Sequence, residues 1–221
     1  MIKRALKEDI LKYIKHFPSI LITGARQVGK STLAMSIGIE NCVTFDYIAT
    51  YESAKADPKG FVSSLTKPVI IDEVQKVPDI FRSIKEHIDK DRKAGTFILT
   101  GSTNLQGFKE ISESLAGRIG IIELYPFNLS ECYESQHNLI DILTSDNERE
   151  GNLVDLDIGM HVIKGGFPEI QAMNDQKLIY LWFSSYISTY IERDARDMGD
   201  IRNLDGFMKL YRGLALRSGN L

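Results

Sequence analysis

Short, unbroken apolar runs alternate along this sequence with segments in which apolar residues recur at every third or fourth position. The unbroken runs predict strands that are buried on both faces, because a strand with one exposed face carries polar residues at every second position. The three- and four-residue spacing predicts amphipathic helices. The expected strands are 20–23, 42–45, 69–71, 97–99 and 119–124. The expected helices are 6–17, which Pro18 ends, 31–35, 61–65 and 80–88.

The alternation of strands with helices predicts the fold class. Consecutive parallel strands need a crossover connection, which is usually a helix, so this order is typical of an α/β protein whose parallel sheet is sandwiched by helices. After Pro126 the strand signals fade, and helical spacing returns in 178–190 and 207–214. We therefore expect an α/β core over residues 1–134 and a helical region over 135–221. The polar, turn-rich segment 144–157 is expected to be a surface connection.

The composition is that of a folded globular chain, with 43% hydrophobic and 26% charged residues in a length of 221. That length exceeds the usual size of one domain, so one large domain, or one domain with part of a second, is expected. The formal net charge of -3 provides no molecule-wide attraction for nucleic acid or an anionic membrane. No apolar stretch approaches the roughly 20 residues of a membrane span, and no signal-type run opens the sequence, so a cytoplasmic protein without a membrane partner is expected.

The strongest functional signal is the sequence GARQVGKS at residues 24–31, which fits the phosphate-binding pattern G-x-x-x-x-G-K-[ST] between an apolar strand and a helix. Backbone N–H groups of such a loop surround a phosphate, whose charge the helix N-terminus favours. Lys30 is expected to reach the β- and γ-phosphates, and the Ser31 hydroxyl to bind Mg²⁺. Arg26 either contacts a phosphate or pairs with a neighbouring acid. The candidate nucleotide-binding residues of the loop are Gly24, Ala25, Arg26, Gln27, Val28, Gly29, Lys30, Ser31 and Thr32.

Two acids follow the expected strand 69–71. Many strands end in an acid, so Asp72 and Glu73 alone would say little. After a phosphate-binding loop in an α/β sheet they acquire specific roles. Asp72 is expected to hold the Mg²⁺ shell, and Glu73 to polarise the water that attacks the γ-phosphate.

Three further polar residues stand next to expected strands. Thr100 and Ser102 follow the strand 97–99, and ligand sites of parallel sheets lie at the carboxyl ends of strands. Either hydroxyl is therefore a candidate sensor of the γ-phosphate, although such hydroxyls also cap turns. Arg118 precedes the strand 119–124, where it acts either as a phosphate-facing arginine finger or in a surface salt bridge.

Cysteine, histidine and aromatic residues suggest no further chemistry. Cys42 and Cys132 lack zinc or redox spacing, so both are expected to be buried reduced thiols. The four histidines show no metal-ligand spacing. An aromatic stripe at helical spacing is typical of a core rather than of a base-stacking platform, and the mixed-charge run 192–197 suits a solvated face. The stripe consists of Tyr180, Trp182, Phe183, Tyr186 and Tyr190.

Several sequence blocks, in this order, resemble one group of prokaryotic AAA+-type P-loop ATPases, whose C-terminal part is a domain of unknown function. The blocks are GARQVGKS at 24–31, VIIDEVQ at 69–75, FILTGS at 97–102, SLAGR at 114–118, LYPF at 124–127, GGFPE at 165–169 and YIERD at 190–194. The resemblance implies an AAA+-like ATPase core with ATP and Mg²⁺ as cofactors. It also implies that Lys30 and Ser31 belong to the Walker A motif, and Asp72 and Glu73 to Walker B.

The same resemblance favours Arg118 as an arginine finger, acting in cis or on a neighbouring subunit of a homo-oligomer. Members of the group usually continue well past a segment such as 214–221, so the chain is expected to be a fragment that ends at the start of a C-terminal domain. The role of the part that is missing, and whether this length of chain hydrolyses ATP alone, stay open.

Together these features predict a Mg²⁺-dependent ATPase that couples hydrolysis of ATP to ADP and phosphate to a conformational change or to assembly. The catalytic candidates are Lys30, Glu73 and Arg118, and the metal-binding candidates are Ser31 and Asp72. A slow nucleotide-operated switch and a DNA-associated ATPase are the alternatives. The sequence does not identify the protein or nucleic-acid client.

Overall fold

The computed structural model of the chain describes residues 2–102, 115–134, 158–191 and 203–218. They form two compact units, Met1–Gln171 and Ala172–Leu221, and the described strands all belong to the first unit. The expected boundary at residue 134 stays a prediction. The segment 144–157 and the charged run 192–197, both expected at the surface, lie outside the described residues.

The first unit is built on a five-stranded sheet with the order β2-β3-β4-β1-β5. All four neighbouring pairs run parallel, so the predicted α/β class with a parallel sheet is confirmed. Each strand begins within one residue of its expected start. The strands are β1 (Ser19–Thr23), β2 (Cys42–Thr44), β3 (Val69–Asp72), β4 (Phe97–Thr100) and β5 (Ile119–Glu123).

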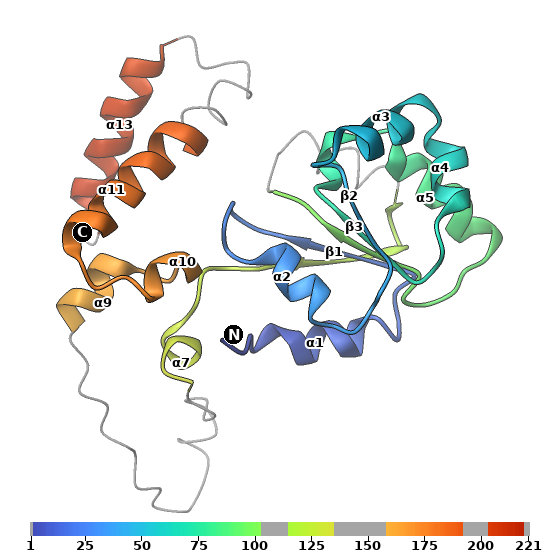
Figure 1. Ribbon diagram of the computed structural model, residues 1–221, viewed down its shortest axis with the longest axis horizontal. Coiled ribbons are helices and arrows are strands. Elements are labelled where there is room, and N and C mark those ends of the chain that lie inside the picture. The colour runs from blue at the N-terminus through green and yellow to red at the C-terminus, as the bar shows by residue number, and fades with distance from the viewer. Residues whose placement is uncertain (1, 103–114, 135–157, 192–202, 219–221) are drawn as a thin grey trace, which may run out of the picture. The chain divides into compact units, whose positions relative to one another are not determined.

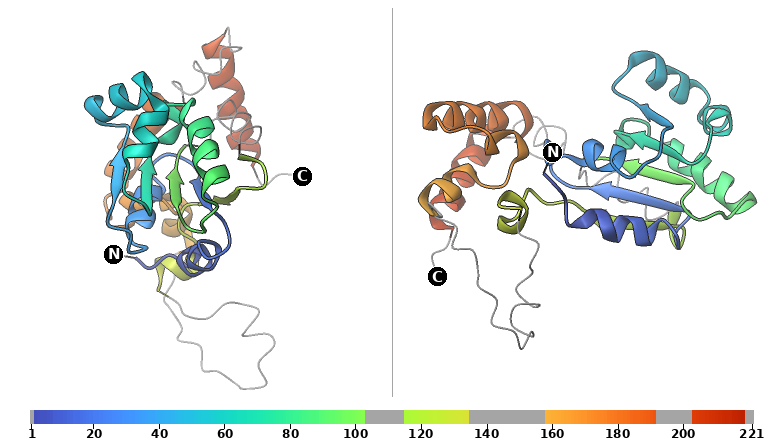
Figure 2. Two further views of the ribbon diagram at one scale, coloured as in Figure 1. Left: turned by 90° about the vertical axis from the view of Figure 1, so that its right-hand side faces the viewer. Right: turned by 60° about the horizontal axis from the view of Figure 1, so that its bottom comes forward.

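Helices cover both faces of this sheet, with α1 and α2 on one side and α3, α4 and α5 on the other (Figures 1 and 2). They are α1 (Leu6–Tyr13), α2 (Lys30–Met35), α3 (Ile48–Ala56), α4 (Pro58–Ser64), the 3₁₀ turn η1 (Val74–Lys76) and α5 (Ile80–Lys90). After β5 the first unit continues with α7 (Leu129–Cys132), α9 (Ile158–Lys164) and α10 (Pro168–Gln171).

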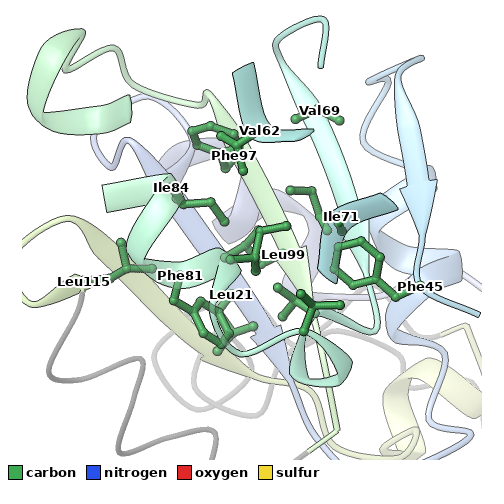
Figure 3. Close-up of a cluster of buried hydrophobic side chains, with 14 of the residues drawn as sticks. Leu21, Phe45, Val62, Val69, Ile71, Phe81, Ile84, Phe97, Leu99 and Leu115 are labelled. Carbon is green, nitrogen blue, oxygen red and sulfur yellow. The ribbon is translucent and has the colours of Figure 1, made fainter. Parts of the chain in front are cut away.

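Alternate residues of the strands enter two separate hydrophobic clusters. Leu21 and Ile71 pack with α4 and α5, whereas Ile22 and Ile70 pack with α1 and α2. Figure 3 shows the first cluster, in which Phe81 of α5 lies against the strands. A shift of one residue in register would exchange the two faces of a strand. Complete burial of an apolar side chain contributes roughly 1.5–3 kcal/mol, so the clusters hold the carboxyl ends of the strands in fixed positions.

The second unit contains α11 (Gln176–Tyr186), the π-helical turn η2 (Ile187–Ile191) and α13 (Leu204–Arg217). The aromatic stripe, expected to form a core, is only half-buried at four of its five residues, and Tyr180 is 76% exposed, whereas Ile179 is fully buried. The aromatic rings pack on one another, with Trp182 stacked on Tyr186 at 5.2 Å between ring centroids. Residues four apart lie above one another on a helix, which explains this self-packing. Among the described residues, no helix combines the length and the apolar character needed to cross a membrane.

The two cysteines differ from the sequence expectation in burial. Both are free thiols, as expected, but Cys42 is exposed and Cys132 is half-buried. Cys42 opens β2, which lies at the edge of the sheet, so on one side of that strand the described residues supply no neighbouring strand to cover it.

Candidate functional site

Most of the polar residues that the sequence predicts to be functional lie at one end of the sheet, where the strands reach their carboxyl ends. Because β1, β3 and β4 run parallel, their carboxyl ends lie together at this end, which is where α/β proteins bind ligands. The phosphate-binding loop, residues 24–29, follows β1, while Asp72 ends β3 and Thr100 ends β4. The hydrophobic clusters described above hold these three strand ends in register.

The turn from β1 into α2 depends on glycine at two positions. Gly24 has φ +142°, and a Cβ atom there would lie 2.2 Å from the Leu124 carbonyl oxygen, which follows β5. Gly29 has φ +92° and immediately precedes α2. L-amino acids with a side chain rarely adopt such angles. The first and last glycines of the motif are therefore required by the path of the backbone.

Lys30 is almost completely buried, with 6% of its surface exposed. Its ammonium donates hydrogen bonds to the carbonyl oxygens of Gly24 and Ala25, at 3.1 and 2.7 Å, so the side chain folds back into the loop. Burial lowers the pKa of Lys30, an effect that the nearby Glu73 carboxylate opposes and the Arg26 guanidinium reinforces. A buried cation at the first residue of a helix that follows a glycine-containing loop is suited to an anionic ligand.

Asp72 is the centre of a hydroxyl network. The Ser31 hydroxyl donates to Asp72 Oδ1 at 2.5 Å, and the Thr100 hydroxyl donates to the same oxygen. On the other oxygen, the Thr44 hydroxyl donates to Oδ2 at 3.3 Å. The sequence pointed to three of these four residues, whereas Thr44 of β2 carried no signal beyond its place at the end of a strand.

Glu73 directly follows β3 and adopts the left-handed conformation, with φ 57°. The Gln75 amide nitrogen donates to Glu73 Oε2, while Gln75 Oε1 is buried and has no hydrogen-bond partner among the described residues. We assigned Gln75 no role from the sequence, although it lies inside the block VIIDEVQ that carries the family resemblance. It fixes the direction in which the Glu73 carboxylate points.

The two candidate sensor hydroxyls differ in their surroundings. Thr100 is fully buried, and its hydroxyl also lies 3.4 Å from the Glu73 backbone N–H. Ser102 is half-buried and lies two residues further along the chain, past the end of β4. Thr100 is therefore engaged with the two acids, whereas Ser102 stands at the rim of the site.

Arg118 lies at the other end of the strands, where β1 and β5 begin. Its carbonyl oxygen accepts hydrogen bonds from the Ser19 backbone N–H and hydroxyl, at 3.2 and 3.0 Å, where β1 begins. Five strand residues rise about 16 Å, so its backbone stands about that far from the loop at the other end of β1. The guanidinium is instead paired with Asp89 of α5, with 2.6 Å between Nε and Oδ1. The structure thus does not bring Arg118 to the phosphate-binding loop of its own chain.

A cavity of about 380 Å³ adjoins the phosphate-binding loop. The loop and the start of α2 line it on one side, and the N-terminal segment with residues that follow β5 lines it on another. Its lining residues are Ile2, Lys3, Arg4, Lys7, Val28, Gly29, Thr32, Leu33, Ser36, Phe127 and Pro168. This space lies next to the expected phosphate position, and its size suits a nucleoside. The N-terminal part of its lining was missed, because nothing in the spacing connects residues 2–7 with the loop.

The oxygen groups of Ser31 and Asp72 fit a magnesium ion. Mg²⁺ prefers oxygen ligands and is usually held by one or two protein groups together with substrate phosphates. Among the described residues, no three His, Cys, Asp or Glu side chains are grouped for metal binding.

Known proteins resemble the chain over most of its length. Uncharacterized proteins of Mycobacterium tuberculosis and Mycobacterium bovis are each 30% identical to it over 185 residues, which is 82% of this chain and 37% of theirs. An uncharacterized protein of Methanocaldococcus jannaschii is 29% identical over 140 residues, covering 63% of this chain and 30% of its own. The chain thus spans little more than a third of the length of the curated relatives that it matches.

Two solved structures are distantly similar. DnaA from Aquifex aeolicus, bound to AMPPCP, aligns with a TM-score of 0.46 and 16% identity over 85% of this chain and 64% of its own. A Walker-type ATPase of Pyrococcus abyssi aligns with a TM-score of 0.42 and 16% identity over 98% of this chain and 77% of its own.

Two family models match the sequence directly. A domain of unknown function matches residues 156–221, which confirms the resemblance seen in the C-terminal blocks. An AAA domain matches residues 16–133, more than half of the chain, and this range contains β1 to β5 and the phosphate-binding loop. The AAA-type P-loop fold indicates nucleotide binding. The chain belongs to the AAA domain family.

Proposed function

We propose that the protein is a Mg²⁺-dependent ATPase, which hydrolyses ATP to ADP and phosphate and couples this reaction to a conformational change or to assembly. One observation carries the proposal: a buried lysine, a hydroxyl and two acids come together at the carboxyl ends of β1 and β3. These residues are Lys30, Ser31, Asp72 and Glu73. They provide the positive charge, the metal ligands and the base that phosphoryl transfer to water requires.

In this mechanism the residues of the chain orient ATP and the attacking water. Lys30 leaves its two carbonyl partners in the loop and pairs with the β- and γ-phosphates. Glu73 accepts a hydrogen bond from the water and draws off its proton as the oxygen attacks the γ-phosphorus, and the bond to the β–γ bridging oxygen breaks. Held by Ser31 and Asp72, Mg²⁺ would neutralise negative charge on the phosphates. Ser102 is the preferred γ-phosphate sensor, because the Thr100 hydroxyl is engaged with Asp72.

Arg118 completes the proposal as an arginine that acts on a neighbouring subunit. Its position at the amino end of β5, with Asp89 as its partner, supports action in trans over action in cis. An arginine finger stabilises the charge of the transition state and contributes roughly 10³–10⁵-fold to turnover in enzymes that use one. Hydrolysis would then depend on assembly of the chain.

The test is ATP turnover per chain as a function of protein concentration, with Mg²⁺ present and Lys30→Ala as the blank. The proposal expects activity per chain to rise with concentration, and Glu73→Gln to bind ATP but to lose about 10²–10⁴-fold in turnover. If Glu73→Gln hydrolyses ATP as fast as the original protein, the base is wrongly assigned. Absence of ATP binding by the original protein would end the proposal altogether.

A slow nucleotide-operated switch is the second candidate, and the Gln75–Glu73 hydrogen bond favours it. An amide that holds the base in one direction also restrains it when ATP is bound. The switch differs from the ATPase in one measurable respect: saturating ATP would change the conformation of the chain at a protein concentration where turnover stays at the level of the Lys30→Ala blank.

A further inference from the structure

Arg4 connects the phosphate-binding loop with the segment that follows β5. Its side chain is only 10% exposed. Arginine is rarely buried unless its charge is paired. One terminal nitrogen donates to the Tyr125 carbonyl oxygen at 2.5 Å, and the other donates to the Val28 carbonyl oxygen of the loop at 3.4 Å. The guanidinium carbon lies 4.5 Å from the centre of the Phe127 ring, close enough for a cation–π interaction.

The charge of Arg4 is balanced by Glu131, whose side chain is 7% exposed. Glu131 Oε1 lies 3.2 Å from Arg4 Nε and accepts a hydrogen bond from the Ala5 backbone N–H at 2.9 Å. Its Oε2 accepts from the Asn128 backbone N–H at 3.2 Å, while the Asn128 side chain accepts from the Glu131 N–H at 2.8 Å. This reciprocal cap fixes the start of α7. Arg4 is thus tied to residues 125–132, which we call the β5–α7 segment.

The same arginine lines the cavity beside the loop, together with Val28 and Phe127. The Phe127 backbone N–H donates to the Gly166 carbonyl oxygen at 2.7 Å, and a Cβ atom at Gly166 would lie 2.2 Å from the Phe127 carbonyl oxygen. The β5–α7 segment therefore packs closely against the residues just before α10, and Pro168, the first residue of α10, also lines the cavity. A molecule in the cavity would touch Arg4, the phosphate-binding loop and the β5–α7 segment.

We propose that Arg4 is a positioning residue that couples the nucleotide occupancy of this cavity to the conformation of the β5–α7 segment. The proposal rests on the proposed function, since ATP is taken as the occupant. The planar guanidinium donates to two carbonyl oxygens in different directions, and its interaction with Glu131 is an ion pair, since Nε makes no hydrogen bond among the described residues. A lysine at this position would keep a charge opposite Glu131 but would not bridge the two carbonyl oxygens. Arg4→Lys therefore separates the bridging role from the ion pair.

Cys132 reports the state of the segment, because it follows Glu131 in α7 and its sulfur lies 3.4 Å from Gln171 Oε1. In a Cys42→Ser background it is the only cysteine of the chain. The experiment measures the rate at which a thiol reagent labels Cys132, with and without a saturating non-hydrolysable ATP analogue and Mg²⁺. We expect the analogue to slow labelling about fivefold or more, the lower end of ordinary allosteric coupling. In Arg4→Lys we expect the same rate with and without the analogue.

Arg92→Lys is the matched control, because Arg92 also donates to a backbone carbonyl, that of Gly117 at 2.9 Å, but does not line the cavity. This variant should keep the full effect of the analogue. Thermal unfolding checks that Arg4→Lys is folded, and binding of a fluorescent ATP analogue is measured on the same samples. No binding by the Cys42→Ser protein would refute the proposed function, and with it the coupling. Binding without any change in labelling, or unchanged slowing in Arg4→Lys, would overturn the coupling alone.

Discussion

At the scale of single residues, Lys30 shows how the proposed site balances stability against binding. Its ammonium is buried, and burial lowers its pKa. The unfolded chain therefore binds this proton more tightly than the folded chain does. The folded protein carries the full penalty at any pH below the lowered pKa, and the penalty declines as the pH rises from that pKa to the ordinary value. A bound phosphate would remove the penalty without a change of pH.

Lys30→Met should therefore make the ATP-free protein at least as stable as the original protein at pH 7, while abolishing its stabilisation by ATP. In the original protein, ATP at 100 times its Kd should add about 2.7 kcal/mol, or roughly 5–10 °C in Tm for a chain of this size. Thermal unfolding with and without Mg²⁺ and ATP measures both effects. An equal rise of Tm with ATP in Lys30→Met would show that this lysine does not bind the phosphates.

Gln75 tests whether the direction of the Glu73 carboxylate matters for turnover. Because Gln75 donates to Glu73 Oε2 and its own Oε1 is unpartnered among the described residues, Gln75→Ala removes one hydrogen bond to a charged group and leaves no new unpaired donor. Such a bond contributes about 1.5–3 kcal/mol, so we expect kcat to fall at least about tenfold with KM unchanged. Single-turnover kinetics measures this change. Faster turnover in Gln75→Ala would mean that Gln75 restrains the base, as the switch requires.

At the scale of elements, much of the fold was predictable because its signals are local. The strands β1, β3 and β4 are apolar runs buried along their whole length, as predicted. The edge strands β2 and β5 are largely half-buried or exposed, so the expected burial on both faces is wrong for them, because each has a neighbouring strand on one side only among the described residues. The helix α3 was missed because its apolar residues do not form one face: Ile48 is 78% exposed, whereas Ala54 is fully buried. The helices α7 and α10 span only four residues each, too few to establish a periodicity.

The candidate site divides in the same way between local and long-range signals. The loop and the acids after β3 are contiguous motifs, so the sequence located them. The Arg4 contact with Tyr125 joins residues 121 positions apart, and the hydrogen bond of Thr44 to Asp72 joins different strands. No spacing rule connects such pairs, since packing of the sheet and its helices brings them together.

Two glycines separate the effect of a positive φ from the effect of a clash with a nearby atom. Gly24 and Gly38 both have positive φ, but a Cβ atom would meet the Leu124 carbonyl oxygen at Gly24 and nothing within 4 Å at Gly38. Gly38→Ala should cost only about 1–2 kcal/mol of strain. Gly24→Ala should cost about 3–5 kcal/mol, because strain adds to a displacement of the backbone after β5. Urea unfolding compares the two variants, and equal losses would contradict the close approach of Leu124.

At the scale of the whole molecule, the separation of Arg118 from the loop of its own chain makes the arrangement of subunits testable. In the proposed assembly, the loop of one chain and the arginine of the next form each active site. A head-to-tail interface of this kind presents different surfaces on its two sides. Lys30→Ala would then damage only the loop side, and Arg118→Ala only the arginine side.

Mixing these two inactive variants should therefore restore activity. In an equal mixture, about a quarter of the interfaces would join an intact Lys30 to an intact Arg118, if the chains assemble at random. We expect turnover of about that fraction of the original rate, measured at a protein concentration where activity per chain no longer rises. Asp89→Asn is the control for the loss of the ion pair alone, and it should keep most of its activity because surface pairs contribute little. A mixture no more active than its two components would contradict action in trans, and an active Arg118→Ala protein would remove this arginine from the mechanism.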